Sequence, residues 1–189
     1  MPTHKEVIKD LKENILFSLQ WILIALVLGS ICGMVGAAFH HAIDYVTEFR
    51  EHRDFMVYLM PVGGVLIIFL YRIASLGYEP GTNTILQSVR QQDRVPVKLA
   101  PTIFLTTIIT HLVGGSSGRE GAALQIGGSI ATAFGRIAKV DKKQMSILVM
   151  CGMSAVFAAL FGTPLTATIF SMEVVSVGTF YLAAFVPCL

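Results

Sequence analysis

The apolar residues of this chain fall into long continuous runs rather than into the alternating pattern of a soluble fold. The longest run extends from Ile15 to Phe39 without a charged residue, and a second extends from Phe55 to Ala74 with only Arg72 near its end. About 20 apolar residues are enough for a helix to cross the hydrocarbon core of a bilayer. Both runs therefore predict membrane-spanning helices.

Three further apolar segments are shorter and rich in small residues. They cover Leu99 to Val113, Met145 to Leu160 and Pro164 to Val177. Short apolar segments that end at glycine breaks are typical of the discontinuous helices that form ion sites inside membranes. The sequence therefore predicts an all-α integral membrane protein with tilted and discontinuous transmembrane helices, embedded in a lipid bilayer.

The first fourteen residues differ from the rest because lysines alternate with carboxylates around a few apolar positions. This pattern predicts an amphipathic helix (residues 1–14) lying on the membrane face, followed by one membrane domain (residues 15–189). Two other basic stretches lie outside the spans, within residues 87–98 and 133–145. Because positive charge marks the cytoplasmic side, we expect the N terminus to be cytoplasmic.

Composition narrows the function classes. Hydrophobic residues make up 54% of the chain and charged residues only 14%, which is too little charge for the surface of a soluble domain. The net charge of +2, without a basic patch, gives no indication of a nucleic-acid partner. The three cysteines lie in apolar runs without metal-ligand spacing, so they predict reduced core residues, no metal site and no cofactor.

The chemistry concentrates in residues 114–128, where Arg119 and Glu120 are surrounded by glycine between two apolar segments. Charged residues inside a membrane are costly and mark pathways for ions or protons. A turn that ends where a helix begins also presents free N–H groups and the positive end of a helix dipole, which together attract an anion. A carboxylate beside such a site competes with the anion, and its protonation opens the site. Glu120 is therefore the candidate gate.

Two segments carry a resemblance to a known family. Residues 118–127 (Gly-Arg-Glu-Gly-Ala-Ala-Leu-Gln-Ile-Gly) and residues 158–173, which begin Ala-Ala-Leu-Phe-Gly-Thr-Pro-Leu, are similar in sequence and spacing to signatures of the CLC chloride channels and proton-coupled anion antiporters. The resemblance implies the first of two inverted repeats of a homodimeric protein in the plasma (inner) membrane. It also implies selective passage of chloride by a voltage-gated channel or a proton-coupled antiporter gated by Glu120.

The resemblance also implies an anion site. Gly118, Arg119 and Gly121 belong to its helix start, although Arg119 better fits an anchor of the turn than an anion ligand. The family usually supplies a serine hydroxyl from a loop that corresponds to residues 77–85. This chain has Gly-Thr-Asn-Thr-Ile at 81–85, so Thr82 and Asn83 become the candidate anion ligands, with Glu79 as an alternative by distance.

A possible proton path involves Glu173, which matches an acid of the family. The following position carries the proton-transfer glutamate in the chloride exchangers but is Val174 here. This departure indicates either a channel or an exchanger with another proton route, such as the fluoride-exporting branch. The simpler interpretation of Glu173, which we favour slightly, is a carboxylate at a helix end facing the cytoplasm.

Chloride is thus the first expectation, with fluoride/proton antiport as the alternative, because residues 82–84 offer more donors than one serine. A non-conducting half-protein is a second alternative, since the chain has about half the length of a family subunit. Residues 114–118 also match G-x-S-x-G, the nucleophile elbow of hydrolases. That motif needs a preceding strand and a downstream histidine, and neither is expected here, so we predict that the protein is not an enzyme.

Overall fold

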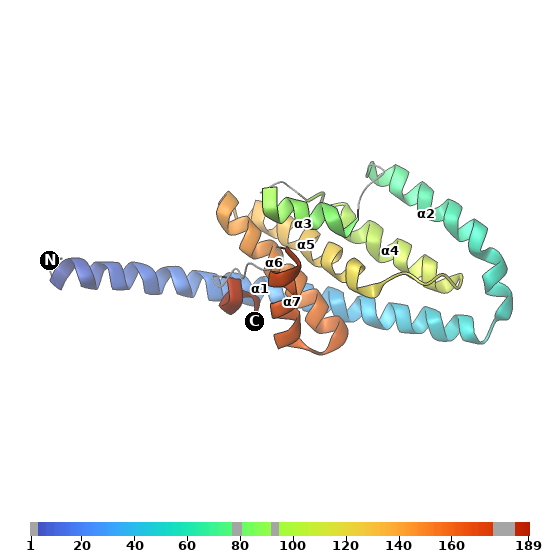
Figure 1. The fold of residues 1–189 in the computed structure, drawn as a ribbon, viewed down its shortest axis with the longest axis horizontal. Coiled ribbons are helices and arrows are strands. Elements are labelled where there is room, and N and C mark those ends of the chain that lie inside the picture. The colour runs from blue at the N-terminus through green and yellow to red at the C-terminus, as the bar shows by residue number, and fades with distance from the viewer. Residues whose placement is uncertain (1–3, 77–80, 92–94, 176–183) are drawn as a thin grey trace.

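The computed structural model describes residues 4–76, 81–91, 95–175 and 184–189, and these residues are almost entirely helical, without a β-strand. The all-α prediction is therefore confirmed (Figure 1). In chain order the elements are α1 (His4–Glu51), the 3-10 helix η1 (Asp54–Leu59), α2 (Met60–Ala74), α3 (Thr82–Gln91), α4 (Leu99–Leu112), α5 (Arg119–Ile137), α6 (Lys142–Phe161), α7 (Pro164–Val175) and α8 (Phe185–Cys188).

Helix α1 is much longer than the run that predicted it. It continues from His4 through the apolar run to Glu51, so the polar residues that follow Phe39 form the last part of the same helix. Nothing between Phe39 and Glu51 interrupts a helix, because this stretch contains neither glycine nor proline. The N-terminal part of α1 extends away from the other helices, whereas its second half lies along them (Figure 1).

Three helical stretches of the described chain are long and apolar enough to cross a membrane: Leu19–Glu51, Asp54–Ala74 and Gln144–Phe161. The first two confirm the predicted spans, while α6 is longer than the short segment expected there. Pro61 does not break α2, because it lies at the start of that helix, where a missing N–H costs nothing. Only 6% of the apolar window in Asp54–Ala74 is buried, against 56% in Gln144–Phe161. The second span is therefore peripheral and the third is central.

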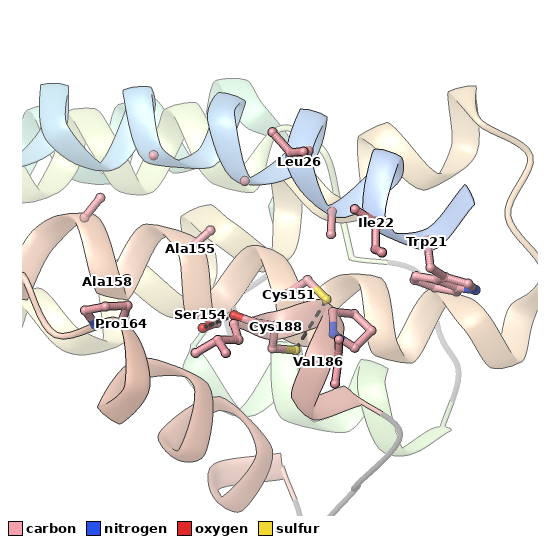
Figure 2. Close-up of a pocket in the computed structure, with 16 residues that line it drawn as sticks. Trp21, Ile22, Leu26, Cys151, Ser154, Ala155, Ala158, Pro164, Val186 and Cys188 are labelled. Atoms are coloured by element: carbon pink, nitrogen blue, oxygen red, sulfur yellow. Dashed lines mark hydrogen bonds between the residues drawn. The ribbon is translucent and has the colours of Figure 1, made fainter. Parts of the chain in front are cut away.

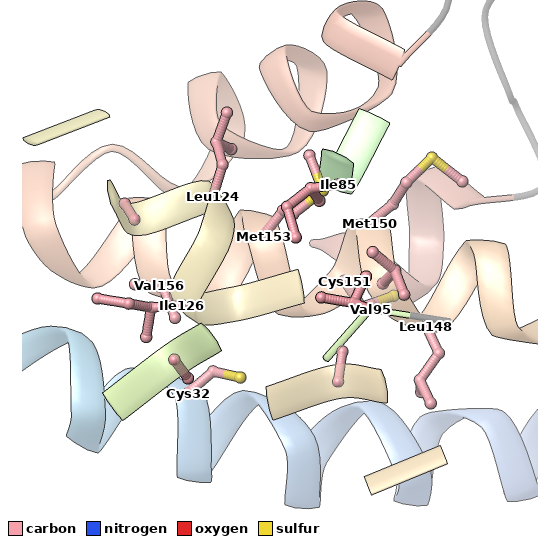
Figure 3. Close-up of a cluster of buried hydrophobic side chains, with 14 of the residues drawn as sticks. Cys32, Ile85, Val95, Leu124, Ile126, Leu148, Met150, Cys151, Met153 and Val156 are labelled. Atoms are coloured by element: carbon pink, nitrogen blue, oxygen red, sulfur yellow. The ribbon is translucent and has the colours of Figure 1, made fainter. Parts of the chain in front are cut away.

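Helix α6 organises the core because α1, α5, α7 and α8 all pack against it. Buried residues from α1, α3, α5 and α6 meet there, including Cys32, Ile85, Ile126 and Met153 (Figure 3). The closest approach is between α5 and α6, where a Cβ on Gly127 would lie 2.6 Å from the carbonyl carbon of Gly152. Glycine at this position allows the two backbones to touch.

The glycines of α1 differ in whether another helix packs against them. A Cβ on Gly36 would lie 2.8 Å from the Cβ of Ala159, so this glycine does admit α6. A Cβ on Gly29 or Gly33 would have no atom of the described residues within 4 Å, and these two glycines line an open groove instead.

Residues 82–85 of the predicted loop are helical instead. Helix α3 begins at Thr82, so Thr82, Asn83 and Thr84 form its first turn, and Thr84 N–H donates to the carbonyl of Gly81 at 3.0 Å. The alternative ligand, Glu79, lies outside the described residues. This difference matters for the candidate site, because Thr82 and Asn83 lie in the first turn of a helix rather than in a loop.

Candidate functional site

Two helix starts meet at one place in the fold. Thr82 is the first residue of α3, and Gly118 is the N-cap of α5, with extended backbone angles (φ −66°, ψ 122°). A Cβ on Gly121 would lie 2.9 Å from the hydroxyl oxygen of Thr82, so this hydroxyl rests on the first turn of α5. Glycine at 121 is what leaves room for it.

A cavity of about 410 Å³ opens at this meeting point, between α2, α3, α4 and α5. Its wall is rich in hydroxyl groups, contributed by Thr82, Thr106, Thr107, Thr110 and Ser117. Tyr71 and Gln125 add a phenol and an amide, and Gly118 and Gly121 bring backbone to the surface. Hydroxyl, amide and backbone N–H groups are hydrogen-bond donors, which an anion can use in place of water.

The backbone at the start of α5 has unused donors. The first N–H groups of any helix have no partner within it, and Gly118 has no side chain with which to cap them. These groups and the helix dipole favour a negative charge next to the first turn. The cavity therefore combines donors with positive potential.

The predicted site residues fall into two groups. Thr82, Gly118 and Gly121 line the cavity, whereas Asn83 and Glu120 are exposed side chains that do not form part of its wall. Glu120 is the second residue of α5, in the first turn beside the free N–H groups.

Arg119 also points away from the cavity wall. Its Nη1 lies 3.3 Å from Oδ1 of Asp44 in α1, and Nε2 of His40 lies 3.2 Å from the other carboxylate oxygen. Arg119 thus ties the start of α5 to α1, which is the arrangement of an anchor. Glu173 is half-buried in the last turn of α7, and Val174 beside it packs against the core.

Sequence reasoning missed most of the hydroxyls in the wall. Thr106, Thr107 and Thr110 appear in the sequence only as polar interruptions of an apolar helix. Their spacing places the three side chains within about one helical turn of each other. This clustering was the sequence signal that could have indicated a polar site. Gln125 belonged to a recognised motif but was not assigned a role.

The geometry does not support a hydrolase. Ser116 is exposed and follows helix α4 rather than a strand. Nδ1 of His111 lies 2.9 Å from the carbonyl oxygen of Thr107 and 3.4 Å from the hydroxyl of Ser117. Because a carbonyl only accepts hydrogen bonds, Nδ1 carries a proton and is not a base for Ser117.

A second hollow has a different character. It is a groove of about 480 Å³ between α1, α6 and α8, lined by apolar side chains such as Trp21, Leu26 and Val186 (Figure 2). Its sulfur atoms, Cys151 Sγ and Cys188 Sγ, are 3.3 Å apart as free buried thiols. A charge entering this groove would lose its water without gaining enough donors, so the hydroxyl-lined cavity is the better ion site.

The fold and this cavity define an integral membrane protein of the all-α class with a polar site between helix starts. Residues 63–189 match the family described as voltage-gated chloride channels. The chain belongs to this family, which confirms the resemblance found in its sequence.

Related sequences and a solved structure agree with this family assignment. A chloride/fluoride channel protein of Pseudomonas syringae pv. tomato is 31% identical over 170 residues, which cover 89% of this chain and 38% of the relative. A H(+)/Cl(-) exchange transporter, ClcA of Citrobacter koseri, is 27% identical over 191 residues, covering 89% and 39%. A crystal structure of a CLC-type fluoride/proton antiporter superposes with a TM-score of 0.83 at 32% identity, over 100% of this chain and 45% of that chain.

The chain thus spans less than half the length of these proteins. All of them are named as channels, exchangers or antiporters rather than enzymes. Their names agree with the predicted class of anion transport.

Proposed function

We propose that this chain forms part of a pathway for a small halide across the membrane, with fluoride preferred to chloride. The observation that carries the proposal is the hydroxyl-lined cavity where α3 and α5 begin. Neutral hydroxyls and backbone N–H groups replace the hydration shell of an anion without holding it as tightly as a lysine or arginine would. Ion release, which transport requires, stays possible.

Two reasons favour fluoride over chloride as the preferred substrate. This order is the reverse of the one that the sequence motifs favoured. Fluoride is smaller and holds its water more tightly, so its site needs close donors. The cavity wall offers the hydroxyls of Thr82, Thr107 and Ser117 together with the backbone N–H groups at the start of α5. The two proteins above 30% identity are named for chloride/fluoride and for fluoride/proton transport, whereas the exchanger named for chloride alone is 27% identical.

We further propose that Glu120 is the gate and that Glu173 belongs to a proton path. The support for Glu120 is its place in the first turn of α5, next to the donors that an anion would use. The support for Glu173 is only its match in the family motif. With Val174 in place of a proton-transfer acid, antiport of protons would need a route other than that of the chloride exchangers.

Assembly and orientation are proposals of the same kind. The family resemblance favours a homodimer in the plasma (inner) membrane, with a cytoplasmic N terminus and residues 1–14 on the membrane face. Helix α1 is continuous across residue 14, so such an N-terminal segment would share one helix with the first span.

The proposed function predicts that the complete protein in liposomes releases fluoride at least about tenfold faster than chloride. A tenfold ratio corresponds to about 1.4 kcal/mol of differential stabilisation, which is within the range of a single hydrogen bond to a charged group. Parallel efflux from vesicles loaded with each halide, followed with ion-selective electrodes, measures the ratio. Faster chloride release would restore chloride as the substrate, and release of neither would indicate a non-conducting protein.

Two glycines provide a matched test, one in the cavity wall and one outside it. Gly121→Ala would press a Cβ against the Thr82 hydroxyl at 2.9 Å and displace it, so we expect halide efflux to fall about tenfold. Gly64→Ala on α2 is the control, because nothing in the described chain lies within 4 Å of its Cβ position and Gly64 is not part of the cavity wall. Equal efflux in both variants would show that the position of Thr82 is unimportant.

A further inference from the structure

The hydroxyl groups in the cavity differ in whether their protons are available. A threonine hydroxyl has one proton to donate, so a hydroxyl that already donates to a backbone carbonyl offers an anion only lone pairs. Thr106 Oγ1 donates to the carbonyl of Thr102 at 2.9 Å, and Thr110 Oγ1 donates to the carbonyl of Thr106 at 2.7 Å. Both protons are therefore committed within α4.

Thr107 is the exception on this helix. Its side chain faces the same cavity and it is as buried as its neighbour, with 6% of its surface exposed against 5% for Thr106. Its carbonyl accepts a hydrogen bond from Nδ1 of His111, but its hydroxyl has no hydrogen-bond partner among the described residues. Because its proton is not committed to a carbonyl of the described chain, this hydroxyl can donate to an anion in the cavity.

Two other hydroxyl groups in the cavity wall also keep a proton that is not donated to a carbonyl. The Thr82 hydroxyl rests on Gly121 and has no hydrogen bond within the described chain. The Ser117 hydroxyl has one contact, to His111 at 3.4 Å, where the histidine proton is already directed at the carbonyl of Thr107. The serine and threonine hydroxyls that keep an uncommitted proton therefore come from three parts of the chain: the start of α3, the middle of α4 and the link before α5.

We infer that Thr107 is the residue of α4 that donates to the transported halide and that it helps to select fluoride over chloride; this inference rests on the proposed function. Attraction between a donor and an anion increases as their separation falls, and fluoride, being smaller, approaches an O–H group more closely. Loss of the Thr107 proton therefore weakens fluoride binding more than chloride binding. Thr110 has no such effect, because its proton is never offered.

The test compares isosteric variants of the complete protein. Thr107→Val removes the free hydroxyl and Thr107→Ser retains it. Thr102→Val is the control, because it removes a hydroxyl of the same helix that donates to the carbonyl of Lys98 at 2.8 Å and is not part of the cavity wall. Titration calorimetry with sodium fluoride and with sodium chloride in detergent gives both Kd values, and efflux from liposomes gives transport. Melting temperatures in detergent show whether each variant is folded.

We expect Thr107→Val to raise the Kd for fluoride about tenfold or more, as loss of a hydrogen bond to a charged acceptor does. The Kd for chloride should change less than about threefold, and Thr107→Ser and Thr102→Val should stay near wild type. Equal loss in the two valine variants, or no loss in Thr107→Val while the wild type binds fluoride, would overturn the inference but leave the proposed function intact. A wild-type protein that neither binds nor releases halide would overturn both. If Thr107→Val fails to fold, the serine variant still decides, because wild-type fluoride selectivity in Thr107→Ser supports a hydroxyl donor and its loss contradicts one.

Discussion

Replacement of Glu120 with glutamine is expected to make halide passage independent of pH. The carboxylate lies in the first turn of α5, where the unused N–H groups attract negative charge. An ionised carboxylate competes with the anion for these donors, and protonation ends the competition. We therefore expect wild-type efflux to slow as the pH is raised and Glu120→Gln efflux to stay constant over the same range. The glutamine side chain has nearly the same shape as that of glutamate but stays neutral at every pH, so it does not compete with the anion as a carboxylate does.

Efflux from liposomes buffered at a series of pH values measures this effect, with proton movement followed in the same vesicles. Glu48→Gln is the matched control, because it makes the same change at another exposed carboxylate, on α1. Its pH profile should be that of the wild type. A Glu120→Gln protein that keeps the wild-type pH profile would exclude Glu120 as the gate.

Gly127→Ala is expected to be the most destabilising single-methyl change in the chain. The added Cβ would overlap the carbonyl oxygen of Gly152 and lie 2.6 Å from its carbonyl carbon and 2.9 Å from the Cα of Met153. These are backbone atoms, so α5 and α6 would have to separate along the most closely packed contact of the fold. Overpacking of this kind costs about 1–3 kcal/mol, more than the roughly 1 kcal/mol that alanine gains over glycine in a helix.

Thermal unfolding of the complete protein in detergent, monitored by size-exclusion recovery, measures the change. Gly64→Ala on α2 is the control, since nothing in the described chain lies within 4 Å of its Cβ position. It should leave the melting temperature unchanged or raise it through helix propensity. A Gly127→Ala protein as stable as the Gly64→Ala protein would mean that α5 and α6 do not touch at this point.

The sequence by itself determined the class of the protein and indicated where its candidate site lies. Runs such as Ile15 to Phe39 are sufficient to predict spans, because the cost of burying charge and unpaired backbone in lipid allows few alternatives. Residues 118–127 located the start of α5 in the same way, since glycines around a charged pair indicate a helix start inside the membrane. Thr82 was chosen through the family resemblance, which aligns residues 81–85 with a loop that supplies a hydroxyl to the anion.

Other features depended on contacts between residues distant in the sequence. The sequence does not distinguish Thr107 from Thr106 or Thr110, because the direction of each hydroxyl is set by its rotamer and by the packing of α4 against α1, α2 and α5. The same holds for Arg119, whose pairing with Asp44 spans 75 positions. Periodicity records which residues are apolar, but only the tertiary structure decides which protons remain free to bind an ion, because hydrogen bonding depends on distances that no local pattern encodes.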